Sequence, residues 1–272
     1  MNKIDANDRT VRQVLDKVKY IIDFFQREYR WERKHIEQLI DDLTTKFLTK
    51  YEKTHNRRDV QNYDKYYLGP IVLSEKKEGK SIIDGQQRLT SLTLLLIYLN
   101  SLQKNRNDKV EIKDLIFSEK YGEKSFNLDV PDRKRCIEAL YNGEDYNHTE
   151  KSESIENIIE RYKDIQELFP EELKGEALPY FIDWLIENVI FVEILTYSDE
   201  DAYTIFETMN DRGLNLTPTE MLKGYILSNL ADVESKKQVN ELWKNMIEKL
   251  RKISKEEDLE FFKAWLRAKY AE

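Results

Sequence analysis

The sequence predicts an α+β fold, in which a small mixed sheet with helices is followed by a mainly helical section. Two observations support this prediction. β-branched and aromatic runs of strand length gather in the first half of the chain, whereas apolar residues at helical spacing dominate the second half. Only five prolines and eight glycines occur among the 272 residues, so we expect few interrupted helices.

The composition is that of a folded protein with a densely charged surface. Hydrophobic residues make up 40% of the chain and charged residues 35%. The net charge of -8 means that nucleic acid could bind only at a local basic face. The single cysteine, Cys136, excludes an internal disulfide and fits a reducing compartment. No secretory signal is visible, and the apolar stretch Leu89–Leu99 is too short to span a bilayer. We therefore expect a cytoplasmic protein with no membrane partner.

Helices and strands alternate in the first half of the chain. Apolar residues three and four positions apart predict helices at Arg9–Val18 and Glu32–Phe47, because this spacing places them on one helical face. β-branched and aromatic residues predict three strands, at 19–25, 66–74 and 80–85, the last two joined by a charged turn.

The helix after Gly85 carries leucine or isoleucine on every side, which predicts a central, buried helix. A short strand is expected at 125–130, and Pro131 suits the first turn of a helix that runs to Tyr141.

A polar segment, Gly143–Ser154, is the best candidate for an internal linker. We therefore expect a core at 1–142 and a mainly helical section at 143–272 that packs back on it. Helical periodicity or capping signals predict helices at 155–169, 176–188, from 199 to the "NDRG" segment, after Thr217, at 236–252 and at 256–270. The segment 188–197 is rich in β-branched residues and predicts one further strand.

The stretch "IIDGQQR" places polar residues between a strand and the buried helix. The first N–H groups of a helix lack intrahelical acceptors and attract anions. Gly85 allows close backbone approach, Gln86 and Gln87 add neutral donors, and Arg88 adds a guanidinium suited to phosphate. The alternative is structural: Asp84 could cap the helix and Gln87 could complete a capping box.

Two other polar motifs accompany this stretch. "FFQREYRW" places Gln26 and Arg27 between a strand and a helix, and "FETMNDRGLNLTPTEMLK" places Glu207 and Asn210 three residues apart on one helical face. Each motif also has a purely structural interpretation. The first would be a basic helix start, and Asn210 would end its helix in a left-handed cap while Glu207 faces solvent.

These three motifs, in this order, resemble the N-terminal domain family of GmrSD-type restriction enzymes, the "DGQQR" family with a ParB/sulfiredoxin-like core. The resemblance covers most of the chain from Lys19 to Leu230. The family's proline three residues before the Gln-Arg pair is replaced here by Asp23. The resemblance implies a module that binds and hydrolyses a nucleoside triphosphate within an antiphage system that cuts foreign DNA.

The resemblance also implies the roles of the site residues. The nucleotide-binding residues would hold phosphate oxygens and compensate their charge: Gln26, Arg27, Gly85, Gln86, Gln87 and Arg88. The catalytic residues would be Asp84, Glu207 and Asn210. Asp84 and Glu207 would hold a magnesium ion or orient the attacking water, and Asn210 would orient Glu207 or touch the nucleotide. Oxygen ligands suit Mg²⁺, and such hydrolysis needs no covalent nucleophile.

The expected partners follow from the same resemblance. An HNH-type nuclease domain or subunit would cut DNA, since the three histidines of the chain form no paired cluster near an asparagine. We expect the chain to be the nucleotide module alone or to stop short of such an effector. DNA contact is expected, if anywhere, at the basic clusters 26–34 and 53–58. Two alternatives stay open: a nucleotide-gated DNA- or partner-binding switch with little hydrolysis, and a scaffold whose motifs only cap helices.

Overall fold

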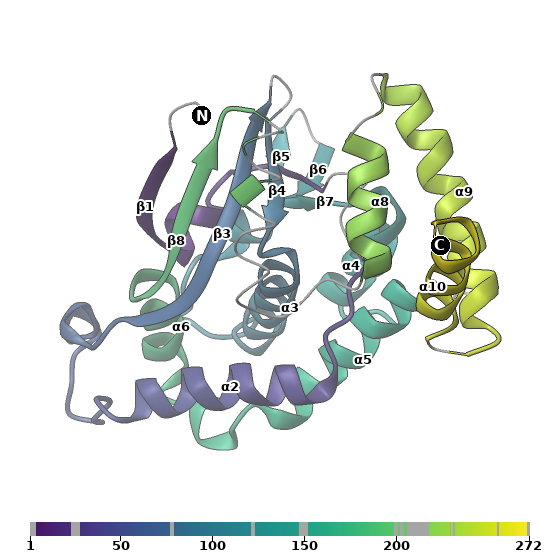
Figure 1. Cartoon of the computed structure of the whole chain (residues 1–272). Helices are drawn as coiled ribbons and strands as arrows, with labels where there is room; N and C mark the ends of the chain where they lie inside the picture. Colours follow the sequence, from purple (N-terminus) through teal and green to yellow (C-terminus); the bar gives the residue numbers. More distant parts are fainter. Residues whose placement is uncertain are drawn as a thin grey trace. The chain divides into compact units, whose positions relative to one another are not determined.

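The computed structural model describes residues 4–270 except 23–27, 77–78, 121–122, 147–151, 199–200, 202–203, 206–217, 229, 231 and 255. The chain divides into two compact units. The first contains the described residues up to Tyr197, and the second contains the described residues from Ser198 onward. Figure 1 shows strands and helices in the first unit and helices in the second, so the predicted α+β class with a helical C-terminal section is confirmed.

A mixed sheet in the first unit has the strand order β1-β8-β3-β4-β2-β7. Its strands are β1 (Asp5–Thr10), β2 (Tyr20–Ile22), β3 (Tyr66–Lys76), β4 (Gly79–Asp84), β7 (Leu128–Asp129) and β8 (Val189–Thr196). β3 runs parallel to β8 and antiparallel to β4, while β2 runs parallel to both β4 and β7. A separate antiparallel hairpin joins β5 (Phe117–Lys120) to β6 (Glu123–Phe126).

Six α-helices of the described chain belong to this unit. They are α1 (Val11–Leu15), α2 (Arg33–Leu48), α3 (Gln86–Leu102), α4 (Pro131–Asn142), α5 (Glu153–Leu168) and α6 (Leu178–Glu187). Short 3-10 helices span Arg57–Asn62, Lys113–Leu115 and Glu171–Leu173. α5 packs against α2, α3 and α4, and α1 and α6 pack against β8.

The helix α3 is the centre of this packing. Every residue from Leu89 to Leu99 is buried, as the all-round apolar pattern predicts. Burial on all sides fixes the helix firmly, so the turn that precedes it has a rigid support.

The N-terminal segment differs from its prediction. Asp5–Thr10 forms the strand β1, which pairs with β8, and the helix begins only at Val11, after a capping box made by Thr10 and Gln13. "DANDRT" lacks the alternation of apolar residues that marks a strand. The pairing with β8 therefore decides its conformation.

Strand β8 lies in the interior of the sheet, between β1 and β3. It comes from the part of the sequence expected to form the helical section. Together with α5 and α6 it lies in the first unit, which extends to Tyr197. Parallel pairing with β3 joins segments more than a hundred residues apart, which no local pattern reveals.

The second unit consists of α8 (Pro218–Ser228), α9 (Val233–Arg251) and α10 (Glu257–Tyr270) in its described part. Trp243 and Phe262 stack with ring centroids 5.2 Å apart, and Arg251 donates to Asp258 at 2.7 Å. These contacts hold α9 and α10 together. The proposed cap residue Thr217 and most of the helix expected from residue 199 lie outside the described residues.

Candidate functional site

The turn between β4 and α3 is built around Gly85. This residue has φ +98°, in the left-handed region, and its carbonyl accepts the first helical hydrogen bond from Leu89 at 3.0 Å. A Cβ at this position would meet Cγ2 of Ile71 on β3 at 2.6 Å. Glycine is therefore required by both the backbone conformation and the space. The tight turn leaves the first N–H groups of α3 without intrahelical acceptors at the end of β4.

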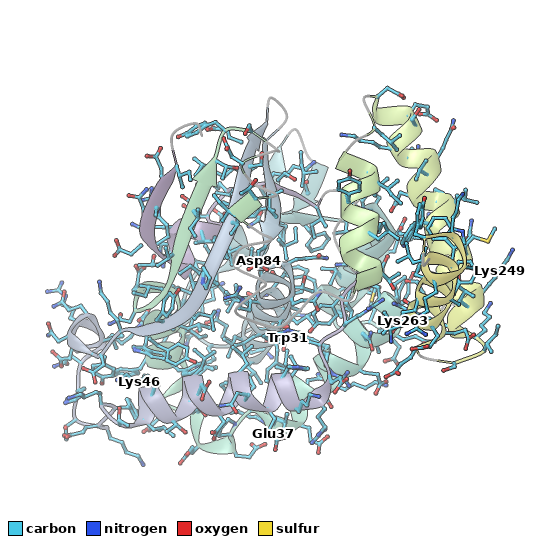
Figure 2. All side chains as sticks on the ribbon, viewed as in Figure 1. Trp31, Glu37, Lys46, Asp84, Lys249 and Lys263 are labelled. Carbon is cyan, nitrogen blue, oxygen red and sulfur yellow. The ribbon has the colours of Figure 1, made fainter. Side chains whose placement is uncertain are left out.

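Arg88 and Asp84 face each other across this turn. Nη2 of Arg88 lies 3.3 Å from Oδ2 of Asp84, and both side chains are partly exposed, by 22% and 31%. Figure 2 labels Asp84 at the end of β4. The guanidinium also lies over Gly69 of β3, where a Cβ would fall 1.9 Å from Nη1. A partly exposed cation beside a helix N-terminus is an arrangement that favours anions.

The side chain of Gln87, which is expected from the sequence to hold phosphate oxygens, bonds the backbone of a distant segment. Its Oε1 accepts from the backbone N–H of Arg30 at 2.8 Å, and its Nε2 donates to the carbonyl of Glu28 at 3.0 Å. The amide group thus bonds the backbone of the "FFQREYRW" motif at two positions after Gln26 and Arg27. The helix cap is Gly85, without a side-chain cap bond, so the structural alternative of a capping box between Asp84 and Gln87 is wrong.

Gln86 is the first residue of α3 and is only 3% exposed. Its burial and that of Gln87 leave Arg88 and Asp84 as the more accessible side chains of this motif. A phosphate in contact with the Gln86 side chain would therefore have to reach below the protein surface, at the first residue of α3.

The segment Glu28–Arg30 brings further residues to this region. The hydroxyl of Tyr29 lies 2.7 Å from Oγ of Ser91, which itself donates to the carbonyl of Gln87. Burial raises the pKa of Tyr29 well above its usual range, so this hydroxyl keeps its proton and donates.

Two more side chains hold the same segment. Nη2 of Arg133 lies 3.3 Å from Oε2 of Glu28, and Asn157 donates to the carbonyl of Tyr29 at 2.9 Å. The sequence interpretation missed these residues, and it also missed Ser91. Only Ser91, a polar residue inside the apolar run of α3, carried a signal that could have been noticed.

Four predicted site residues lie outside the described residues: Gln26, Arg27, Glu207 and Asn210. The structure therefore brings together Asp84, Gly85, Gln86, Gln87 and Arg88 of the predicted set. Among the described residues, no group of three or more His, Cys, Asp or Glu side chains is placed to hold a metal ion. Asp84 offers one partly exposed carboxylate. Magnesium commonly uses one or two carboxylates together with phosphate oxygens, so this donor fits such an ion.

Arginines of the two basic clusters considered for DNA contact form ion pairs with carboxylates elsewhere in the chain. Nη1 of Arg33 lies 2.8 Å from Asp164, and the guanidinium also bonds Glu167 at 2.8 Å. Nη2 of Arg57 lies 2.6 Å from Asp183. These pairs are shorter than the 3.3 Å pair between Arg88 and Asp84, so the charges of Arg33 and Arg57 are compensated more fully and attract phosphates less.

The described helices include none long and apolar enough to cross a membrane. A model of the family described as "GmrSD restriction endonuclease, N-terminal domain" matches residues 11–227, which is most of the chain. The match includes the β4–α3 turn and both companion motifs. No curated protein matches this sequence.

Proposed function

Since the chain belongs to the GmrSD restriction endonuclease N-terminal domain family, and so to a restriction-type system, we propose that it binds and hydrolyses a nucleoside triphosphate at the β4–α3 turn. The observation that carries this proposal is the partly exposed Arg88 guanidinium, held beside Asp84 and over Gly69 at the N-terminus of the rigid helix α3. The triphosphate tail would rest on the first turn of this helix.

Each residue of the turn has a distinct proposed task. The backbone at Gly85 and Gln86 would approach the phosphate oxygens, and Arg88 would compensate their charge. Gln87 would act indirectly, because both ends of its amide bond the backbone at Glu28 and Arg30.

The two companion motifs would complete the site. Gln26 and Arg27 would contact the same phosphates. Mg²⁺, when bound, would neutralise charge on the phosphate oxygens, with Asp84 and Glu207 as its protein ligands. Asn210 would orient Glu207 or contact the nucleotide. In this proposal the residues contribute positioning and charge compensation, without a covalent nucleophile.

Nucleotide hydrolysis would serve the cutting of DNA. An associated HNH-type nuclease domain or subunit would supply the nuclease activity, and DNA would be engaged by the assembled system. The paired state of Arg33 and Arg57 argues for a minor contribution of these two residues to DNA affinity.

A titration of labelled nucleoside triphosphates against the wild type and Arg88→Ala tests the proposal. Loss of Arg88 is expected to weaken binding by at least ~1.5 kcal/mol, about tenfold, the value of a charge-assisted hydrogen bond. Arg57→Ala, which removes a paired arginine elsewhere in the same unit, should bind as the wild type does. Equal affinity of the wild type and a folded Arg88→Ala variant would contradict the proposal. Binding without magnesium-dependent phosphate release would favour a nucleotide-gated switch over an enzyme.

A further inference from the structure

Side chains from three helices hold the short segment Glu28–Arg30. Its backbone and side-chain partners are Gln87 and Ser91 of α3, Arg133 of α4, and Ser154 and Asn157 of α5. These bonds satisfy the backbone N–H groups of Tyr29 and Arg30 and the carbonyls of Glu28 and Tyr29. The segment is thus held in place where its backbone bonds the side-chain amide of Gln87, so its position determines the position of that amide.

Arg133 is the charged member of this set. It is the third residue of α4, is only 6% exposed, and pairs with the carboxylate of Glu28 at 3.3 Å. Burial lowers the pKa of Arg133, yet a guanidinium stays charged in proteins. A buried cation of this kind is stable only with its partner, so Arg133 and Glu28 constrain each other strongly.

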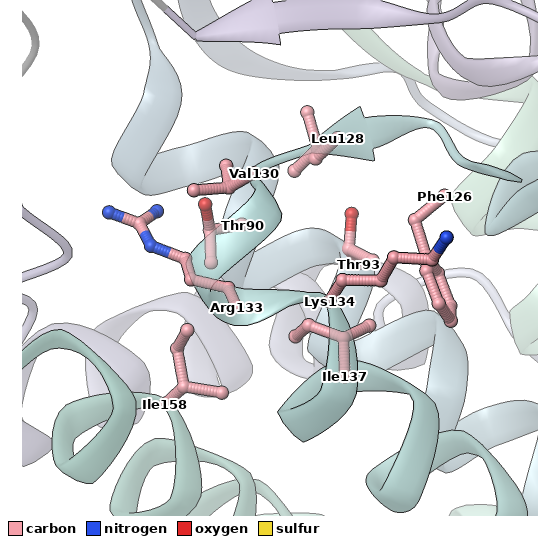
Figure 3. Close-up of a pocket in the computed structure, with 9 residues that line it drawn as sticks. All are labelled: Thr90, Thr93, Phe126, Leu128, Val130, Arg133, Lys134, Ile137 and Ile158. Atoms are coloured by element: carbon pink, nitrogen blue, oxygen red, sulfur yellow. The ribbon is translucent and has the colours of Figure 1, made fainter. Parts of the chain in front are cut away.

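A cavity lies along one side of Arg133. It is lined by Thr90 and Thr93 of α3, Ile137 of α4 and Ile158 of α5, among others. Figure 3 shows the guanidinium directed away from the side of the cavity formed by Phe126. The cavity leaves this side of Arg133 less closely packed, and the ion pair with Glu28 contributes to the direction of its side chain.

We infer that Arg133 is a positioning residue of the phosphate site, acting through Glu28 and Gln87. The inference rests on the proposed function of the β4–α3 turn. Arg133 holds the carboxylate of Glu28, and the carbonyl of Glu28 accepts from the amide of Gln87. Gln87 is the second residue of α3. A shift of the segment would therefore displace the Gln87 amide and strain the first turn of the helix, and displacements of about 1 Å are costly at such sites.

Nucleotide affinity tests the coupling. Arg133→Met is expected to weaken nucleoside triphosphate binding about tenfold, and Arg133→Lys should recover part of the loss because it restores a cation opposite Glu28. The double variant Arg133→Met/Gln87→Leu should bind no more weakly than the worse single variant, since both act through one segment. Losses that multiply, or wild-type affinity in Arg133→Met, would overturn the inference.

Gln103 provides a matched structural control. Its amide makes the same pair of backbone bonds, with the N–H and carbonyl of Val110 at 2.8 and 2.7 Å, but it follows the C-terminal end of α3. Gln103→Leu should lower the melting temperature and leave nucleotide affinity unchanged. If it weakens binding as much as Arg133→Met does, general destabilisation explains the effect and Arg133 has no positioning role.

Hydrogen exchange tests the same coupling without a nucleotide. In Arg133→Met the amides of Arg30, Gln86, Gln87 and Arg88 should exchange faster than in the wild type, whereas in Gln103→Leu they should not. Unchanged exchange at the turn in Arg133→Met would overturn the inference. A wild-type protein that binds no nucleoside triphosphate would refute the proposed function, and this measurement would still decide whether Arg133 positions the turn.

Discussion

The guanidinium of Arg88 occupies the space that a side chain at position 69 would fill. A Cβ on Gly69 would lie 1.9 Å from Nη1 of Arg88 and 3.1 Å from its Cζ. Gly69 has φ +124° and lies next to a register shift between β3 and β8. The strand β3 thus provides a notch for the arginine of α3, although Gly69 lies outside the "DGQQR" motif.

Gly69→Ala is expected to displace the Arg88 guanidinium. Nucleotide affinity should fall at least about tenfold, as in Arg88→Ala, and the positive φ should destabilise the fold by roughly 1–3 kcal/mol. Titration with nucleotide and urea unfolding measure the two effects. Gly143→Ala is the control, because Gly143 has φ +77° but a Cβ there would meet no atom within 4 Å. It should lose stability only, and a Gly69→Ala variant with wild-type affinity would show that the notch is unimportant.

Gly85→Ala should destabilise the protein more than Gly143→Ala does. Both positions have positive φ, but at Gly85 the new methyl group would also press on Cγ2 of Ile71 at 2.6 Å. Strain and overpacking together predict a loss of about 2–5 kcal/mol in the free energy of unfolding. Adding Ile71→Ala removes the clash, so a double-mutant cycle in urea should show less destabilisation than the sum of the single variants. Strict additivity would mean that the two residues do not contact.

Lys80→Met should lower the free energy of unfolding, because it removes a cation that pairs with a buried carboxylate in the sheet. Glu193 on β8 is 5% exposed and accepts from Nζ of Lys80 at 3.0 Å and from Nε of Arg9 at 3.4 Å. With Lys80 removed, Arg9 is the remaining cation paired with Glu193 among the described residues, and a loss of about 1–3 kcal/mol is expected. The double variant Lys80→Met/Glu193→Met should be more stable than Lys80→Met in thermal unfolding. The reverse order would show that Glu193 is stable without Lys80.

Tyr66 is expected to make the free energy of unfolding fall as the pH rises through the alkaline range. Burial, and then the hydrogen bond from its hydroxyl to Asp42 at 3.0 Å, raise the pKa of Tyr66 to about 12. Tyrosine ionises near pH 10 in an unfolded chain, so the folded state holds this proton more tightly. The resulting stability is complete below about pH 10 and is lost as the pH rises towards about 12. Urea midpoints should show the wild type losing its advantage over Tyr66→Phe across this range. Parallel pH curves for the two proteins would contradict the assignment.

The sequence alone determined the α+β class and most helices, because these depend on local periodicity. The apolar run Leu89–Leu99 predicted a buried central helix, and α3 has every one of these residues buried. The "DGQQR" motif also placed a turn and a polar cluster at the start of that helix, since glycine conformation and helix ends are local properties.

Only the tertiary structure decided which distant segments meet. It placed β8 between β1 and β3, gave the polar segment Asp5–Thr10 a strand conformation, and assigned Gln87 to the backbone of Glu28 and Arg30. Arg133 and Gly69 joined the site region in the same way. Sheet pairing and side-chain hydrogen bonds between distant segments depend on where whole elements pack, and a local pattern carries no information about that placement.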